Sequence, residues 1–148
     1  WLKQATPVPG RLFPSTGREG CRFLDDTYNA NPDSFHAAID VLMSAEGEKV
    51  MVAGEMRELG DETESSHREV GEYAARHGVP LLLALGSDCT AMVEAYLEAG
   101  GLRAKHYSDR EALEKDCVDL ANSETVFLVK GSRGARMETV VAALSAEG

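Results

Sequence analysis

Basic residues are scarce in this chain of 148 residues. It carries 15 lysines and arginines against 25 aspartates and glutamates, which gives a net charge of −10. Nucleic-acid binding depends on a basic surface that neutralises phosphates, so we expect no nucleic-acid partner. This charge does not exclude an anionic small molecule, because one local basic loop is enough to bind it.

Cysteines and long apolar runs are also few. Cys21, Cys89 and Cys117 are widely spaced, and no C-x-x-C pair occurs, so neither a zinc knuckle nor a redox motif is indicated. We interpret all three as reduced thiols of a cytoplasmic protein. No apolar run approaches the roughly 18 residues that a membrane-spanning helix needs, and no signal peptide is visible.

The first residues have the composition of a linker rather than of a folded domain. The chain begins without a methionine, at "WLKQATPVPGR". Pro7, Pro9 and Gly10 favour an extended segment. We therefore expect residues 1–10 to be the remnant of an interdomain linker, and residues 11–148 to be one domain of a longer protein.

Beyond that linker, short apolar runs alternate with segments of helical periodicity. "RLFPS" and "CRFLDD" flank a glycine-containing turn, which predicts a hairpin or two adjacent short strands. Strands are further expected at 49–54, 79–86, 104–108 and 125–131, and helices at 32–47, 65–77, 88–99, 108–120 and around 137–144. The strands are continuous apolar runs, which is typical of parallel sheets covered on both faces. We predict an α/β fold, a Rossmann-like three-layer sandwich with a mainly parallel sheet and an antiparallel edge strand or hairpin at the N-terminus.

The most polar connection is "DDTYNANPDS", residues 25–34, between a predicted strand and a predicted helix. Ligands of open α/β sheets bind at the carboxyl ends of the strands, where this stretch lies. One interpretation is an elaborate turn with a helix cap, because Asp and Asn satisfy local backbone groups. The other is a polar binding site built from a carboxylate, a tyrosine face and amides. The residues alone leave both open.

Two further loops follow predicted strands. "GEMRELGDETE" is rich in carboxylates, and we favour a solvated acidic loop over a metal site there. In "VKGSRGARME", residues 129–138, two cations and a hydroxyl precede an expected helix start. Such a start predicts an anion site, although a simple capped helix would look the same. No G-x-x-x-x-G-K-[ST] phosphate loop occurs in the chain.

Four separated motifs now point to a family. "PVPGRL", "DDTYNANPDSFHAAIDVL", "VAGEMRELGDETESSHREVGEYA" and "FLVKGSRGARMETVV" occur in this order. The chain resembles the C-terminal domain of the Mur ligases of peptidoglycan synthesis, and most of all the branch that adds D-alanyl-D-alanine to UDP-N-acetylmuramoyl-tripeptide. The resemblance implies a bacterial cytoplasmic enzyme, expected to be a monomer, that uses ATP and Mg²⁺ to form an amide bond.

The resemblance also implies site residues. ATP would contact Arg11, Asp26, Tyr28, Asn29 and Asn31, with Arg11 and Asp26 at the ribose hydroxyls. The incoming substrate would face Lys130, Ser132 and Arg133, a set that suits the carboxylate of D-alanyl-D-alanine. "GEMRELG" and His67 match the family pattern without an implied role.

The resemblance assigns no catalytic residue and no metal ligand to these 148 residues. The N-terminal UDP-binding domain and the central ATPase domain, which would hold most of ATP and Mg²⁺, are expected outside this chain. The chain alone is therefore not expected to be active.

Two alternatives remain. The first is a stand-alone Rossmann-like module that binds a small molecule without ligase activity. The second is a related ligase that adds diaminopimelate or lysine. "DDTYNANPDS" argues against the second, because those relatives are expected to carry a histidine-containing D-Y-A-H-type stretch at this place.

Overall fold

The computed structural model describes residues 13–28 and 30–145 of the chain. Within that part, strands and α-helices alternate along the sequence. In chain order they are β1 (Phe13–Thr16), β2 (Arg22–Asp26), α1 (Pro32–Ser44), β3 (Glu48–Ala53), α2 (Thr63–Arg76), β4 (Leu82–Leu85), α3 (Cys89–Glu98), β5 (Ala104–Tyr107), α4 (Arg110–Leu120), β6 (Thr125–Lys130) and α5 (Glu138–Ser145).

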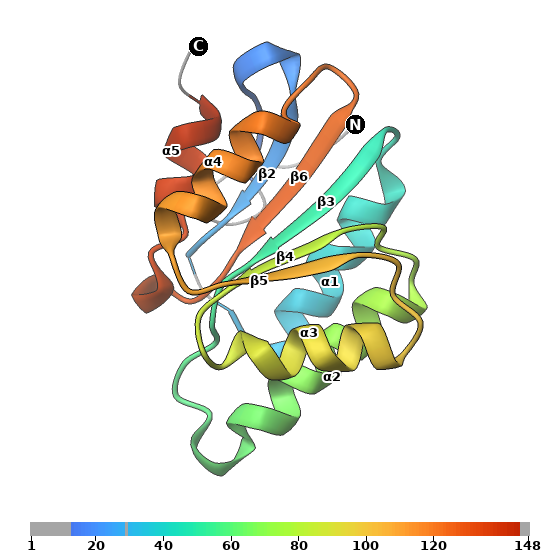
Figure 1. Cartoon of the computed structure of the whole chain (residues 1–148), viewed down its shortest axis with the longest axis vertical. Helices are drawn as coiled ribbons and strands as arrows, with labels where there is room; N and C mark the ends of the chain where they lie inside the picture. Colours follow the sequence, from blue (N-terminus) through green and yellow to red (C-terminus); the bar gives the residue numbers. More distant parts are fainter. Residues whose placement is uncertain (1–12, 29, 146–148) are drawn as a thin grey trace.

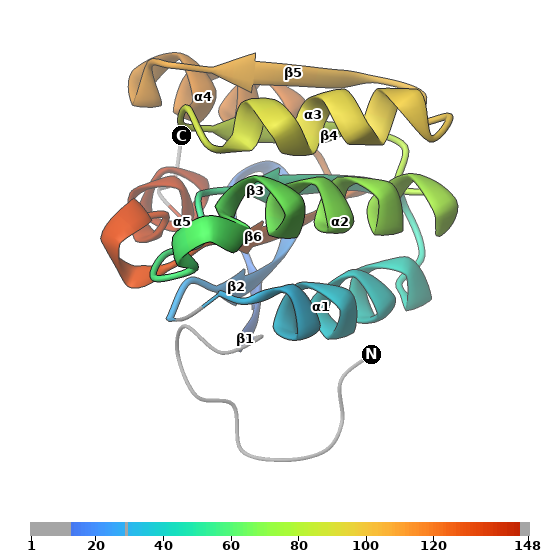
Figure 2. The ribbon, with the colours of Figure 1, turned by 90° about the horizontal axis from the view of Figure 1, so that it is seen from below.

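The strands form one six-stranded sheet in the order β1-β2-β6-β3-β4-β5. Only the β1–β2 pair is antiparallel, and β2, β6, β3, β4 and β5 pair in parallel. Figure 2 shows the strands following one another in this order from β1 to β5. The predicted α/β sandwich with an antiparallel N-terminal edge is confirmed.

Helices cover both faces of the sheet. In Figure 1, α4 and α5 lie to the upper left of the sheet and α1, α2 and α3 to the lower right. Side chains of one strand alternate between the two cores: Leu128 packs with α1, α2 and α3, while Phe127 and Val129 pack with α4 and α5. A strand that is buried on both sides needs apolar residues at every position, which explains the continuous runs in the sequence.

The apolar run at 79–86 is longer than the strand that it forms, because its first residues complete α2 instead. The N–H of Gly78 donates to Ala75 O and that of Val79 to Ala74 O, both in the last turn of the helix. Gly78 has φ +84°, a left-handed conformation that favours glycine at a helix end. Strand β4 therefore begins only at Leu82.

The position of β6 determines which loops meet at the carboxyl ends of the strands. It is inserted between β2 and β3, so strands distant in sequence become neighbours. The chain leaves β2 and β3 towards α1 and α2 on one face, and leaves β6 towards α5 on the other. Loops that part in this way open a crevice at the carboxyl ends of the strands, where ligands of such sheets bind.

The cysteines are buried thiols. Cys21, Cys89 and Cys117 are all free, as expected from their spacing. Burial raises the pKa of the Cys117 thiol to about 12. Within residues 13–28 and 30–145, no helix has the length and apolar character required to cross a membrane.

Helices α2 and α3 approach each other at Gly71. A methyl group at this position would lie 2.1 Å from the carbonyl oxygen of Met92 and 3.1 Å from the nitrogen of Tyr96. Both atoms belong to the backbone of α3, so a side chain at Gly71 has no flexible neighbour to displace. The close contact of the two helices thus requires glycine.

We predict that Gly71→Ala lowers the free energy of unfolding by about 1–3 kcal/mol, because overpacking forces the helices apart. In an exposed helix the same change would raise it by about 1 kcal/mol, so the sign of the effect is diagnostic. Urea unfolding checks this, with Ser65→Ala on an exposed position of α2 as the control. A Gly71→Ala chain as stable as the wild type would show that α3 moves away freely.

Candidate functional site

A buried ion pair joins the carboxyl ends of β2 and β6. Asp26 and Lys130 are register partners in the parallel pair, and Lys130 Nζ lies 2.7 Å from Asp26 Oδ2. The two side chains are 10% and 1% exposed. Burial lowers the pKa of Lys130, and the Asp26 carboxylate opposes that shift by stabilising the ammonium. Lys130 also lies 5.3 Å above the ring of Phe35 in α1.

The loops that follow these two strands also meet through side chains. The Arg133 guanidinium, after β6, lies 5.2 Å from the ring centre of Tyr28, after β2. This geometry is a cation–π contact. Tyr28 is 39% exposed, one of three large apolar or aromatic side chains with such exposure among the described residues.

Asn31 begins helix α1. Its side-chain oxygen accepts a hydrogen bond from the N–H of Ser34 at 2.8 Å, and Ser34 Oγ accepts one from the N–H of Asn31 at 3.0 Å. This reciprocal capping box, followed by Pro32 at the first helical position, is a strong start signal. The interpretation of residues 25–34 as a turn with a helix cap therefore holds for Asn31, whose contact with a nucleotide stays a prediction.

An open cleft of about 730 Å³ lies beside these residues, between the loops that follow β2, β3 and β6. Its lining consists of Ala30, Asn31, Arg57, Glu58, Leu59, Ser132, Arg133 and Gly134. Ser132 is 5% exposed, and within residues 13–28 and 30–145 its hydroxyl finds no hydrogen-bond partner. An unsatisfied buried hydroxyl, in a residue that lines a cleft, makes Ser132 a candidate partner for a bound ligand.

The loop after β3 forms the opposite wall, and it supplies a cation that the sequence analysis did not assign. Arg57 lines this cleft, with its side chain 54% exposed. It also lines an adjoining depression of about 250 Å³ at the carboxyl ends of β4 and β5, so the two hollows share one wall. An arginine within an acidic stretch gave no signal of its own, because only the fold brings Arg57 opposite Arg133.

The same loop is more ordered than the acidic composition predicted. Glu58, Asp61 and Glu62 are exposed, as expected of a solvated loop. Met56, in contrast, is 1% exposed, and Glu55 is half-buried, with Oε2 accepting a hydrogen bond from the N–H of Asp88 at 2.9 Å. Most carboxylates of the loop are thus solvated as expected, and Glu55 is the exception.

Backbone contacts hold the loops after β3 and β6 together. The N–H of Gly54 donates to Lys130 O at 2.7 Å, and the N–H of Ser132 donates to Glu55 O at 3.0 Å. A methyl group on Gly131 would lie 3.1 Å from Gly54 Cα, so the two backbone segments approach as closely as glycine allows. The strand pairing thus continues past the ends of both strands, and it places Ser132 beside the cleft.

The last helix lies where the sequence predicted it, around residues 137–144, but it does not start directly behind the loop that holds Ser132. A 3-10 turn at Arg133–Ala135 follows the strand, and Arg136 then adopts a left-handed conformation with φ 57°. Helix α5 begins only at Glu138. Arg110 donates to the carbonyl oxygens of Ala135 and Arg136 in this connection. A helix dipole therefore does not act at Ser132, and any anion affinity of the cleft depends on its guanidinium groups and hydroxyl.

Arg11 and Asn29 lie outside the described residues. No three His, Cys, Asp or Glu side chains gather within the described part of the chain as they would around a metal ion.

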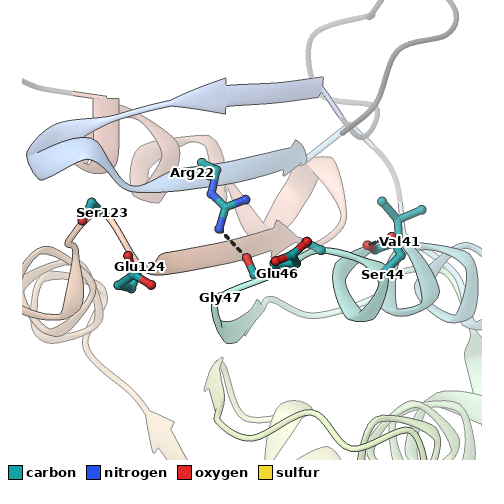
Figure 3. Close-up of a pocket in the computed structure, with 8 residues that line it drawn as sticks. Arg22, Val41, Ser44, Glu46, Gly47, Ser123 and Glu124 are labelled. Atoms are coloured by element: carbon teal, nitrogen blue, oxygen red, sulfur yellow. Dashed lines mark hydrogen bonds between the residues drawn. The ribbon is translucent and has the colours of Figure 1, made fainter.

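Another hollow, of about 610 Å³, lies at the opposite end of the sheet (Figure 3). Its lining residues precede or begin strands β2, β3 and β6, and Arg22 donates to the carbonyl oxygen of Glu46 across it. The amino ends of parallel strands are not where such sheets bind ligands. The candidate site is therefore the cleft at the carboxyl ends.

Removing one partner of the ion pair should lower the free energy of unfolding more than replacing both partners. We predict that Asp26→Asn lowers the free energy of unfolding by about 3–5 kcal/mol, because the buried Lys130 ammonium loses its carboxylate. The double variant Asp26→Asn/Lys130→Met removes that charge and should recover a large part of the loss. Urea unfolding of the two variants checks this, and a double variant less stable than Asp26→Asn would contradict it.

Comparison with known proteins places this fold and cleft in a family. The family model described as "Mur ligase, glutamate ligase domain" matches residues 10–133. The UDP-N-acetylmuramoyl-tripeptide–D-alanyl-D-alanine ligase of Escherichia coli strain K12 is 43% identical over 99% of this chain and 32% of its own length. The ligase of the same name from Haemophilus influenzae is 37% identical over 97% of this chain and 31% of its own length.

Solved structures agree with this relationship. A crystal structure of MurF from Acinetobacter baumannii superposes with a TM-score of 0.82 and 34% identity, over 95% of this chain and 31% of that one. MurF from Thermotoga maritima, in complex with ADP, superposes with a TM-score of 0.80 and 27% identity, over the same shares. The chain spans about a third of the length of these relatives. Since the family model covers most of its residues, the chain belongs to the Mur ligase family and forms the glutamate ligase domain of that family.

Proposed function

We propose that this chain is the C-terminal domain of an ATP-dependent ligase that adds D-alanyl-D-alanine to UDP-N-acetylmuramoyl-tripeptide. The observation that carries the proposal is the cleft at the carboxyl ends of β2, β3 and β6, with the buried Asp26 carboxylate beside it and the Ser132 hydroxyl and two arginines in its walls. Relatives that carry this enzyme name align over nearly the whole chain, which supports the choice of substrate.

The reaction expected of this family proceeds through an acyl phosphate. ATP phosphorylates the carboxylate of the UDP-linked tripeptide, and the dipeptide amine attacks the acyl carbon. The tetrahedral intermediate then releases phosphate and leaves the amide, with ADP as the other product. The phosphates and magnesium belong mainly to the central domain in this proposal, so this chain contributes binding and orientation when it closes over that domain.

Nucleotide binding in this proposal depends on Asp26, whose carboxylate would accept hydrogen bonds from the ribose hydroxyls. Lys130 is 1% exposed and 2.7 Å from Asp26. We therefore infer that Lys130 acts through Asp26, by fixing its carboxylate, and not by direct contact with the incoming substrate. In this proposal Asn31, which lines the cleft, and Tyr28, which contacts Arg133, also bind the nucleotide, and Arg11 and Asn29 complete the set.

The incoming dipeptide would bind in the cleft between the loops after β3 and β6. Its carboxylate requires hydrogen-bond donors of opposite charge, which Arg133 and Arg57 supply. Ser132 Oγ lies buried at the same wall without a partner among the described residues. The guanidinium groups and the hydroxyl together suit a carboxylate, while the chain as a whole is acidic.

Separate substitutions should separate the two substrates. In the full ligase that carries this chain, we predict that Asp26→Ala and Lys130→Met raise the KM for ATP by about 10-fold or more, the value of one or two charged hydrogen bonds. Arg133→Ala should raise the KM for D-alanyl-D-alanine by a similar factor. Steady-state kinetics with each substrate varied in turn checks this. A Lys130→Met enzyme with an altered KM for the dipeptide alone would contradict the role given to Lys130.

Exchange of the domain tests the choice of ligase. This chain would replace the corresponding third of the Escherichia coli ligase that it resembles, and ADP release would be measured with D-alanyl-D-alanine, diaminopimelate or lysine. We expect turnover that depends on D-alanyl-D-alanine. Turnover with diaminopimelate or lysine alone would assign the chain to another member of the family. A folded chimaera without any turnover would favour a binding module that has lost ligase activity.

A further inference from the structure

His67 is a fully buried polar residue to which the proposed reaction gives no role. It lies in the second turn of α2 and is 0% exposed. Its Nδ1 lies 2.7 Å from the carbonyl oxygen of Thr63, one turn earlier in the same helix. Its Nε2 lies 3.1 Å from the backbone nitrogen of Met56, in the loop after β3. The imidazole therefore joins α2 to that loop.

The two partners fix the protonation of the ring. A carbonyl oxygen only accepts, so Nδ1 must donate to Thr63. A backbone N–H only donates, so Nε2 must accept from Met56. His67 is thus neutral, with its proton on Nδ1 and its lone pair directed at the loop. In an imidazolium, Nε2 would also carry a proton, and its N–H would face the N–H of Met56 in a buried region.

The contact with Met56 determines where the wall of the cleft lies. Met56 is 1% exposed, so its N–H has no access to water and depends on His67. The next residue is Arg57, which lines the cleft, and the backbone of Glu58 follows in a left-handed conformation with φ 62°. The exposed Arg57 side chain lies against Gly134, with Nη2 3.4 Å from its carbonyl oxygen, a weak contact. Gly54 and Glu55 are held by hydrogen bonds at the start of this loop, and the hydrogen bond to His67 is the buried anchor directly next to Arg57.

We propose that His67 is a positioning residue for the incoming substrate. By accepting the Met56 N–H, it holds Arg57 opposite Ser132 and Arg133, where the guanidinium meets the carboxylate of the dipeptide. The identity of that substrate rests on the proposed function, whereas the anchoring of the loop does not. A purely structural histidine would affect only stability, so the two roles are experimentally distinct.

The anchoring is tested on the isolated chain, without any substrate. Long-range ¹H–¹⁵N spectra should show His67 protonated at Nδ1 and not at Nε2. In His67→Leu, which keeps the volume and removes the acceptor, the Met56 amide should exchange with solvent at least about 10-fold faster, as expected for one lost hydrogen bond. His67→Gln, which offers an acceptor at similar reach, should restore most of the protection. Val50 and Val52 in β3 serve as internal controls.

Two results overturn the anchoring. One is a proton on Nε2, and the other is equal protection of the Met56 amide in His67→Leu and in the wild type. If His67→Leu does not fold, His67→Asn takes its place, because its amide reaches only as far as Nδ1.

The consequence for the substrate is tested in the full ligase by a double-mutant cycle. His67→Leu and Arg57→Ala should each raise the KM for D-alanyl-D-alanine by about 10-fold, with the KM for ATP unchanged. The double variant should show no further rise, because both changes remove the same guanidinium contact. His67→Gln should recover most of the lost affinity.

The outcomes of the cycle separate this inference from the proposed function. If the effects of His67→Leu and Arg57→Ala multiply, His67 does not act through Arg57 and the positioning role is overturned. If the wild-type enzyme has no turnover that depends on the dipeptide, the proposed function fails and the substrate named here fails with it. The exchange of the Met56 amide then still decides whether His67 anchors the loop.

Discussion

The candidate site depends on the parallel hydrogen bonding of β6 to both β2 and β3. The loop that follows β6 thereby lies beside the loop that follows β3, although the two are separated by about half of the chain in sequence. The pairing extends beyond the strands through Gly54 and Ser132, so the first residues of both loops are tied to each other. The Asp26–Lys130 ion pair closes the same edge between β2 and β6. Without β6 in this position, neither the buried carboxylate nor the cleft would exist.

The fold could be predicted from the sequence because each of its signals is local. Continuous apolar runs marked the strands, and helical periodicity with Pro32 and Asp109 at the starts marked α1 and α4. Where the prediction failed, hydrogen bonds that the apolar pattern does not reveal had prevailed over it, one set of them local and the other tertiary. The apolar residue Val79 completes the end of α2 instead of beginning β4. The segment after Lys130 forms a 3-10 turn because Arg110, from another element, binds its carbonyl groups.

The site could be predicted only in part, since a sequence does not display the partners of its side chains. Asp26, Tyr28, Asn31, Ser132 and Arg133 were predicted from the family resemblance and the strand-end rule, and the structure brings these residues to one edge of the sheet, while their contacts with ligands stay predictions. Lys130 looked like a cation available to substrate, because its burial against Asp26 arises only from strand register. Arg57 and His67 gave no usable signal, because their importance follows from which loops face each other.

Pairing Lys130 internally has a consequence for the electric field around the domain. The whole chain has a net charge of −10, whereas the charged side chains that line the cleft among the described residues are two arginines, Arg57 and Arg133, and one carboxylate, Glu58. An acidic body with a positive mouth has a dipole moment directed out of the cleft. Anionic molecules are repelled by most of its surface and attracted at that mouth. Because salt screens exposed charges beyond about 8 Å under physiological conditions, this orientation acts only in the last stage of approach.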